Sequence, residues 1–227
     1  MEKSMKKFCK TVFAIAGIMV IVGAITILAA IIVYNRSESI VGDLSYTFVG
    51  AGGENIRSLN CLTTYGKTTY KEGSEWSVTF SDVYLKGASC GVNGDTLYVR
   101  TEAPGTIEIL GWKIGLYFDF NKNRSAETII TYPSGIELDN VFNEAGIGRI
   151  NIDSMNARTV LIQSPFCGID MTRCQIKDRL VFDSLIGNIN AQNSAPAQVT
   201  VDLRMGRATI SGSTEANVEY GSNLIYK

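Results

Sequence analysis

The feature that most constrains the fold is a repeat in the last third of the chain, residues 135–227. A five-residue pattern with apolar side chains at alternate positions recurs four times, and its first residues are 19, 20 and 19 apart. The copies begin at Gly148, Cys167, Gly187 and Gly206. A second strand-like run follows each copy, led by Val160, Leu180, Val199 and Val218. So short a period is typical of stacked strand units, which bury a continuous core only when coils stack. The repeat therefore predicts a parallel β-solenoid.

Alternation within each turn predicts which side chains point inward. Successive side chains of a strand point to opposite sides, so the columns led by Ile150 and Val160 form the core. Two outward columns form the candidate binding face. They are an apolar stripe (Phe142, Leu161 and Val181) and a polar ladder (Asn151, Asp170 and Asn190). Two explanations of the apolar stripe stay open. The preceding part of the domain covers it, because large exposed apolar patches are rare on soluble surfaces. Alternatively, the stripe is exposed and adhesive.

The N-terminus has the pattern of a membrane anchor. Residues 1–10 carry four lysines and one acid, and residues 11–34 carry no charge. An apolar run of this length spans a bilayer core of roughly 30 Å, whereas a signal-peptide core is shorter. We expect a transmembrane helix at 11–34, a cytoplasmic tail at 1–10, a linker at 35–42 and an extracellular domain. The alternative is a signal peptide cleaved near Ala29-Ala30.

Residues 43–134 show strand signals but no visible repeat. Trp76, Val78 and Phe80 alternate with polar residues, and no segment has a helical period with caps. We expect irregular β coils here that cap the N-terminal end of the regular turns at 135–227. The expected fold is all-β after one transmembrane helix.

Composition excludes several functions. Beyond Arg36 there are 16 Lys and Arg against 21 Asp and Glu, which argues against nucleic acid as a partner. The chain has no histidine, which removes every Ser-His and Cys-His nucleophile. Asp153 and Asp170 are the carboxylates for a polysaccharide-active enzyme, but they fall in different outward columns. Residues 119–127 resemble a calcium loop with Arg124 where glycine is required. We therefore expect no enzyme, metal or cofactor.

Four cysteines follow the apolar run: Cys61, Cys90, Cys167 and Cys174. In an exported domain they permit two disulfides, with three connectivities. Reducing surroundings would instead leave the thiols unpaired. Cys174 lies 19 residues after Met155, so it also fits a buried small apolar position.

Three segments carry a family resemblance. Residues 132–138 (YPSGIEL), the recurring Gly-x-Ile-x-Ile units and residues 95–99 (DTLYV) resemble the bacterial DUF4097 putative-adhesin family. The resemblance implies a right-handed β-helix on a membrane anchor and supplies no catalytic residues. Cys167 departs from the pattern, because glycine otherwise occupies its column.

These observations favour a non-enzymatic, adhesin-like protein of the cell membrane. Its outward columns would bind a wall polymer, a glycan or another surface or membrane protein. The alternative is an envelope sensor or regulatory partner of another membrane protein, because a tail at residues 1–10 is too short to signal alone. A polysaccharide-active enzyme is the remote alternative.

Overall fold

The computed structural model describes residues 41–49, 53, 55–109, 111–116, 126–192, 198–211 and 224–226. The chain divides into two compact units, Met1–Ser39 and Ile40–Lys227, and all described residues belong to the second. The expected tail, transmembrane segment 11–34, most of the linker and Val218 lie outside the described residues. Within the described ranges, no helix has the length and apolar character needed to cross a membrane.

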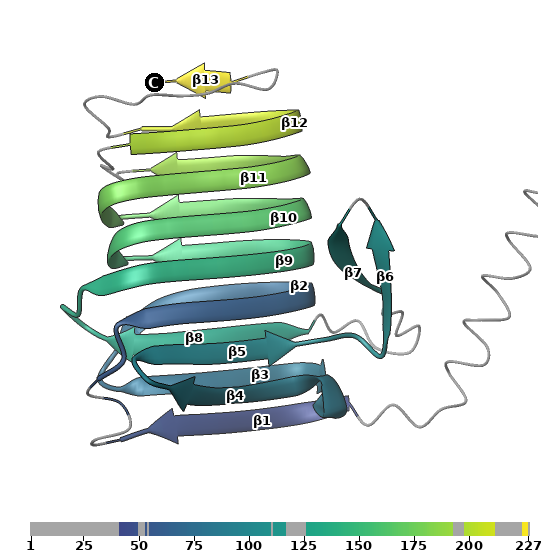
Figure 1. Cartoon of the computed structure of the whole chain (residues 1–227), viewed down its shortest axis with the longest axis vertical. Helices are drawn as coiled ribbons and strands as arrows, with labels where there is room; N and C mark the ends of the chain where they lie inside the picture. The colour runs from purple at the N-terminus through teal and green to yellow at the C-terminus, as the bar shows by residue number, and fades with distance from the viewer. Residues whose placement is uncertain are drawn as a thin grey trace, which may run out of the picture. The chain divides into compact units, whose positions relative to one another are not determined.

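The described residues form an all-β structure with a large, mostly parallel mixed sheet (Figure 1). The strands are β1 (Val41–Phe48), β2 (Ser58–Gly73), β3 (Trp76–Tyr84), β4 (Ala88–Asn93), β5 (Thr96–Thr101), β6 (Gly105–Ile109), β7 (Trp112–Leu116), β8 (Glu127–Pro133), β9 (Leu138–Asp153), β10 (Asn156–Thr172), β11 (Gln175–Gln192), β12 (Gln198–Ile210) and β13 (Leu224–Tyr226). A 3-10 helix, η2 (Leu85–Gly87), joins β3 to β4. Strands β6 and β7 form a separate hairpin.

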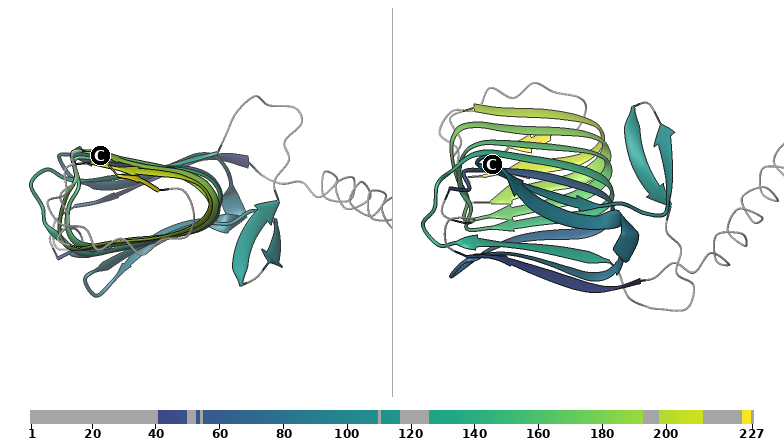
Figure 2. Two further views of the ribbon diagram at one scale, coloured as in Figure 1. Left: turned by 90° about the horizontal axis from the view of Figure 1, so that it is seen from above. Right: turned by 60° about the horizontal axis from the view of Figure 1, so that its bottom comes forward.

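Strands β9 to β12 carry the repeat and pair in parallel with equivalent residues side by side. Val160 pairs with Val141 and Leu180. Ile169 likewise pairs with Ile150 and Ile189. All of these side chains are buried, which confirms both predicted core columns. Each strand bends back on itself, so that successive strands lie over one another when seen from above (Figure 2).

Strand β2 extends this register although it lies far from β9 in the sequence. Leu59 pairs with Val141 and Thr68 pairs with Ile150, as the equivalent residues of later strands do. On its other side β2 pairs in parallel with β5 along its first half and with β8 along its second. The β6–β7 hairpin is inserted between β5 and β8. Strands β5 and β8 therefore follow one another along the same edge of β2.

The far end of the sheet is antiparallel. Strand β3 pairs antiparallel with β8, β4 pairs antiparallel with β5, and β1 pairs antiparallel with β3. The alternating residues Trp76, Val78 and Phe80 lie on β3 and are buried. The sequence thus predicted strands here correctly, but it did not predict their direction.

Glycine is required where the stacked strands bend. Gly148 has φ of +156°, and a Cβ there would lie 1.7 Å from the Gly66 carbonyl oxygen. Gly206 has φ of +133°, and a Cβ there would lie 1.8 Å from the Gly187 oxygen. Both backbone conformations disfavour residues with a side chain, and the backbone of the neighbouring strand lies in contact there. Residues other than glycine are therefore disfavoured at these two positions.

We expect Gly148→Ala to lower the free energy of unfolding by at least about 3 kcal/mol, from backbone strain and overpacking together. Urea denaturation followed by tryptophan fluorescence measures the change. The matched control is Gly91→Ala, because a Cβ at Gly91 meets nothing within 4 Å. Equal midpoints for the two variants would contradict the close stacking at Gly148.

Candidate functional site

The apolar stripe lies on the outer side of the first halves of β9, β10 and β11. Leu161 pairs with both Phe142 and Val181, and all three side chains are half-buried. Asn60 on β2 pairs with Phe142 on one side and with Tyr98 of β5 on the other. The Tyr98 side chain is 45% exposed. The preceding part of the domain thus lengthens this column. In order, the column contains Tyr98, Asn60, Phe142, Leu161, Val181 and Thr200.

Polar side chains flank this column on the same outer side. Two residues further along each strand, the paired positions hold Glu144, Gln163, Asp183 and Asp202. The Gln163 side-chain amide donates a hydrogen bond to Asp183 Oδ2 at 3.3 Å. The result is an amphiphilic surface with an apolar centre, which we call the stripe face.

The polar ladder lies on the second halves of the same strands. Asp170 pairs with Asn151 and Asn190, and Asn190 Nδ2 donates to Asp170 Oδ1 at 3.4 Å. Arg149 Nε lies 3.8 Å from Asp170 Oδ2. The strands bend between the two columns (Figure 2), so the ladder and the stripe lie on different arms of each bent strand. The binding face made of both columns stays a prediction, and the structure adds that a bend in each strand separates its two parts.

A third column lies on the bend itself. It consists of Ile147, Phe166, Ile186 and Met205, which pair in sequence order. Met205 is 61% exposed, and Ile147 and Ile186 are 44% exposed. The period of this column was visible in the sequence, but its exposure depends on the bend.

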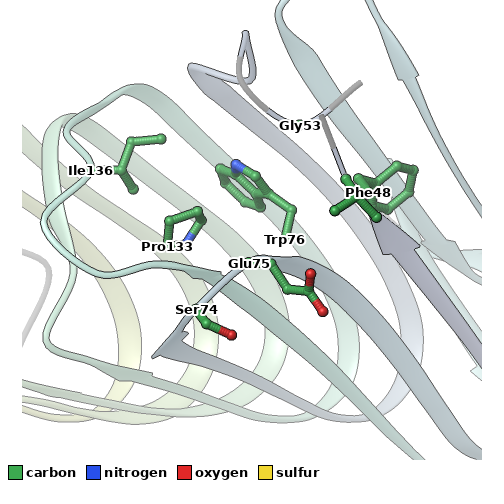
Figure 3. A pocket seen from close by; sticks show the side chains of 8 residues that line it. Phe48, Gly53, Ser74, Glu75, Trp76, Pro133 and Ile136 are labelled. Atoms are coloured by element: carbon green, nitrogen blue, oxygen red, sulfur yellow. The ribbon is translucent and has the colours of Figure 1, made fainter. Parts of the chain in front are cut away.

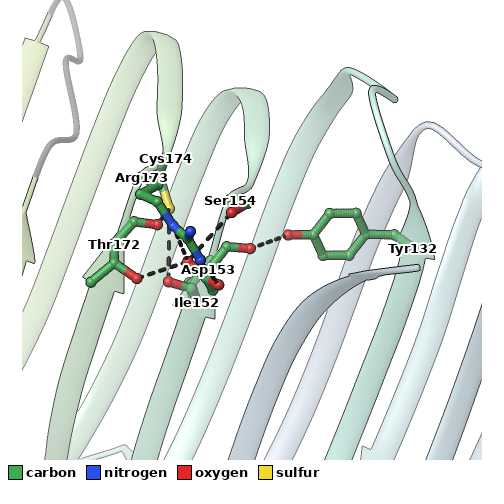
Figure 4. A network of polar contacts seen from close by, with 7 residues as sticks. All are labelled: Tyr132, Ile152, Asp153, Ser154, Thr172, Arg173 and Cys174. Carbon is green, nitrogen blue, oxygen red and sulfur yellow. Dashed lines mark hydrogen bonds and ion pairs between the residues drawn. The ribbon is translucent and has the colours of Figure 1, made fainter.

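Asp153 organises the corner where β9 ends (Figure 4). Its carboxylate accepts hydrogen bonds from Thr172 Oγ1 at 2.9 Å and from Arg173 Nε at 3.0 Å. Its carbonyl oxygen accepts a hydrogen bond from the Tyr132 hydroxyl at 2.7 Å. Ser154 and Arg173 have φ of 60° and 54°, so the corner uses left-handed backbone at equivalent positions. The hydrogen bond from Arg173 is the largest cause of the lowered pKa of Asp153.

We expect Asp153→Asn to reduce the free energy of unfolding at pH 7 by up to about 1 kcal/mol, as for other exposed ion pairs. Because the folded-state pKa is lowered, the carboxylate stabilises the fold above its unfolded pKa of about 3.9. That contribution is lost as the pH falls through the folded-state value. Thermal melts between pH 7 and pH 2 test this. The exposed Asp202→Asn is the control, and a difference that persists unchanged at low pH would contradict the explanation.

No disulfide joins the four cysteines of the described ranges. Cys61 and Cys90 both pair with Val99, on opposite sides of β5. They are thus two strand spacings apart, about 9.6 Å, which is too far for a disulfide. Cys174 is buried, as its spacing from Met155 predicted.

Burial also raises the pKa of three of these thiols. The pKa of Cys61 rises to about 12, and those of Cys90 and Cys167 to about 11. In each case desolvation is the largest cause, because burial disfavours the thiolate. Cys90 is only half-buried, whereas Cys61 and Cys167 are buried.

We expect Cys90 to be alkylated before Cys61 and Cys167 in the folded protein at pH 8, and faster as the pH rises. Two units of pKa reduce the thiolate fraction about a hundredfold, so even Cys90 should react slowly. Cys61 and Cys167 should react only after unfolding in urea. Iodoacetamide labelling with peptide mapping measures the order. Labelling of Cys61 as fast as Cys90 in the folded state would contradict the burial of Cys61.

The candidate carboxylates for catalysis are both engaged with arginine. Asp153 pairs with Arg173, and Asp170 lies near Arg149. Among the described residues, no three His, Cys, Asp or Glu side chains are grouped to hold a metal.

Comparison with known proteins gives structural similarity alone. No protein-family model and no curated protein matches the sequence. A putative cell adhesion protein from Clostridium sporogenes is similar at 13% identity and a TM-score of 0.45, over 82% of this chain and 98% of its own. A putative adhesin from Bacteroides fragilis is similar at 12% identity and a TM-score of 0.40, over 83% and 97%. Similarity at this level assigns neither a family nor a function.

Sequence reasoning missed Asn60 and Tyr98 as members of the outward column. The sequence did contain a signal in residues 66–70 (GKTTY). Like residues 148–152, this segment begins with a glycine and has its core positions at the third and fifth residues. Threonine and tyrosine replace the isoleucines of the later turns, which hid the match. The structure pairs Gly66 with Gly148 and Tyr70 with Ile152.

Proposed function

We propose that this chain is a single-pass membrane protein whose extracellular β-solenoid binds an extended partner through the stripe face. The partner would be a wall polymer, a glycan or another surface protein. The uncharged run at residues 11–34 and the lysines before it support the anchor and its orientation. The in-register pairing of β9 to β12 and the resemblance to the DUF4097 group support the solenoid.

The observation that carries the proposal is the continuity of the outward column. Tyr98 and Asn60 extend the apolar stripe toward β5, and Thr200 ends it on β12. Paired strands are about 4.8 Å apart, so an extended partner lying across them would meet an outward side chain at each step. Half-buried apolar side chains flanked by polar ones have the composition of a binding surface with a polar rim.

Binding without chemistry fits the side chains present. The chain contains no histidine, Asp170 lies beside Arg149, and the hydrogen bond from Arg173 lowers the pKa of the Asp153 carboxyl. A general acid would need a raised pKa instead. These features support an adhesin-like role over a polysaccharide-active enzyme.

In-cell photocrosslinking tests the proposal. A photoreactive side chain replaces Val181 in the full-length protein, and a second variant carries it at Asn188, on the same strand but the opposite outer face. We expect position 181 to crosslink a wall polymer, a glycan or a separate protein, and position 188 to give much less product. Crosslinks from 181 only within the chain, or only from 188 to a partner, would contradict the stripe face.

A pair of substitutions separates binding from folding. Leu161→Asp with Val181→Lys should abolish the partner crosslink from a photoreactive residue at Phe142. Because the two side chains are only half-buried, the cost in stability should be about 1 kcal/mol each. If the partner crosslink survives while the variant no longer unfolds cooperatively, the stripe serves packing and not binding.

A further inference from the structure

A pocket lies at the antiparallel end of the sheet, where three strands terminate (Figure 3). Strand β1 ends at Phe48, β3 begins at Trp76 and β8 ends at Pro133. The cavity between them has a volume of about 310 Å³. Its other lining residues are Val49, Gly53, Ser74, Glu75 and Ile136. No residue of the stripe face contributes to it.

Trp76 leaves a hydrogen-bond donor unsatisfied at this pocket. Its side chain is 2% exposed and packs against Tyr132, with ring centroids 6.2 Å apart. Its Nε1 is buried and has no acceptor among the described residues. Figure 3 shows the nitrogen on the ring edge that points away from β3, between Ile136 and Gly53. Buried indole N–H groups usually have a partner, and because this nitrogen has almost no accessible surface, a ligand oxygen reaches it only when the ring or a lining side chain shifts.

The remaining lining residues restrict the chemistry of that ligand. Phe48, Pro133 and Ile136 are half-buried and supply apolar surface. Glu75 and Ser74 are exposed at the rim, where the carboxylate accepts hydrogen bonds. Among the lining residues that the structure describes, Glu75 is the only charged one, and its carboxylate repels an anionic ligand. The site therefore suits an uncharged ligand with an acceptor oxygen, donor groups and an apolar surface.

We propose that this pocket binds a single N-acetylated amino sugar. The acetamide oxygen accepts the Trp76 indole N–H, and a sugar hydroxyl donates to Glu75. The acetamide methyl group and the C–H surface of the ring pack on Phe48, Pro133 and Ile136. The volume is at the lower end for small-molecule sites, which fits one sugar unit. This site is separate from the stripe face and does not depend on that proposal.

A peptide fits the pocket less well. Peptides that bind sheets usually pair with a continuous strand edge through their backbone. Here the strands terminate: β1 at Phe48, β3 at Trp76 and β8 at Pro133. The pocket therefore offers a compact recess in place of an edge along which a peptide can extend.

The experiment observes the unsatisfied donor directly. The full-length chain is labelled with ¹⁵N-indole tryptophan and purified in a sugar-free detergent. The sequence contains two tryptophans, so two indole N–H signals are expected, and Trp112→Phe assigns them. Methyl N-acetyl-β-glucosaminide is titrated as the probe, and methyl β-glucoside is the matched sugar without the acetamide. The Trp76 signal should shift and saturate with a Kd on the order of 1 mM. The Trp112 signal and the glucoside titration should show no such change.

Two variants test the rim contact. Glu75→Gln should weaken binding of the probe about tenfold, because a charge-assisted hydrogen bond becomes a neutral one. Glu72→Gln removes an exposed carboxylate that does not line the pocket, so it should leave the Kd unchanged.

Each of three results would overturn the proposal. The first is an unshifted Trp76 signal at tens of millimolar probe. The second is an equal response to methyl β-glucoside or to N-acetylalanine methylamide, which would indicate unspecific or peptide binding. The third is an unchanged Kd in Glu75→Gln. The stripe-face variant Leu161→Asp with Val181→Lys should bind the probe normally, so failure of one proposal is distinguishable from failure of the other.

Discussion

Parallel pairing of equivalent residues is the constraint on which the rest of the structure depends. Each residue of β10 lies about one strand spacing, roughly 4.8 Å, from its equivalents on β9 and β11. A side chain must therefore suit its column as well as its own position. The bend is the strictest case, because a Cβ at Gly187 would lie 2.2 Å from the Cys167 carbonyl oxygen. Cys167 occupies the position that glycine holds in the other repeats. A Cβ at its neighbours Gly148 or Gly187 would meet the backbone of the adjacent strand.

The same register determines the surfaces. Equivalent residues form the stripe face on one arm of the bent strands, the polar ladder on the other arm and the exposed column of Ile147 and Met205 on the bend. Repeated surfaces of this kind suit extended partners. The Trp76 pocket lies instead where the regular parallel pairing has ended and β1, β3 and β8 pair antiparallel. Regular and irregular parts of the sheet thus offer two different kinds of surface.

Much of the repeat was predictable because its signal is local. Ile150 and Ile169 alternate with Asn151 and Asp170, and this alternation alone separates core from surface. Strand β2 escaped prediction because its partner β9 lies far along the chain and Thr68 holds a core position. The candidate site was predicted only in part. The apolar stripe was identified, but Asn60 and Tyr98 were not, since only β2 and β5 pairing brings them into its column.

By itself the sequence determined the period, the strands of the repeat and the side of each strand that faces the core, because these depend on residues two or 19 to 20 positions apart. It also determined the chemistry available, because the chain contains no histidine. The tertiary structure alone decided that stripe and ladder lie on different arms of the bent strands, that Cys61 and Cys90 stay apart and that the Trp76 indole N–H has no acceptor among the described residues. The physical reason is that a bend and a pairing between distant strands are set by packing across the whole sheet. The recurring glycines mark the place of the bend but not its direction, and the pairing of distant strands leaves no mark in neighbouring residues.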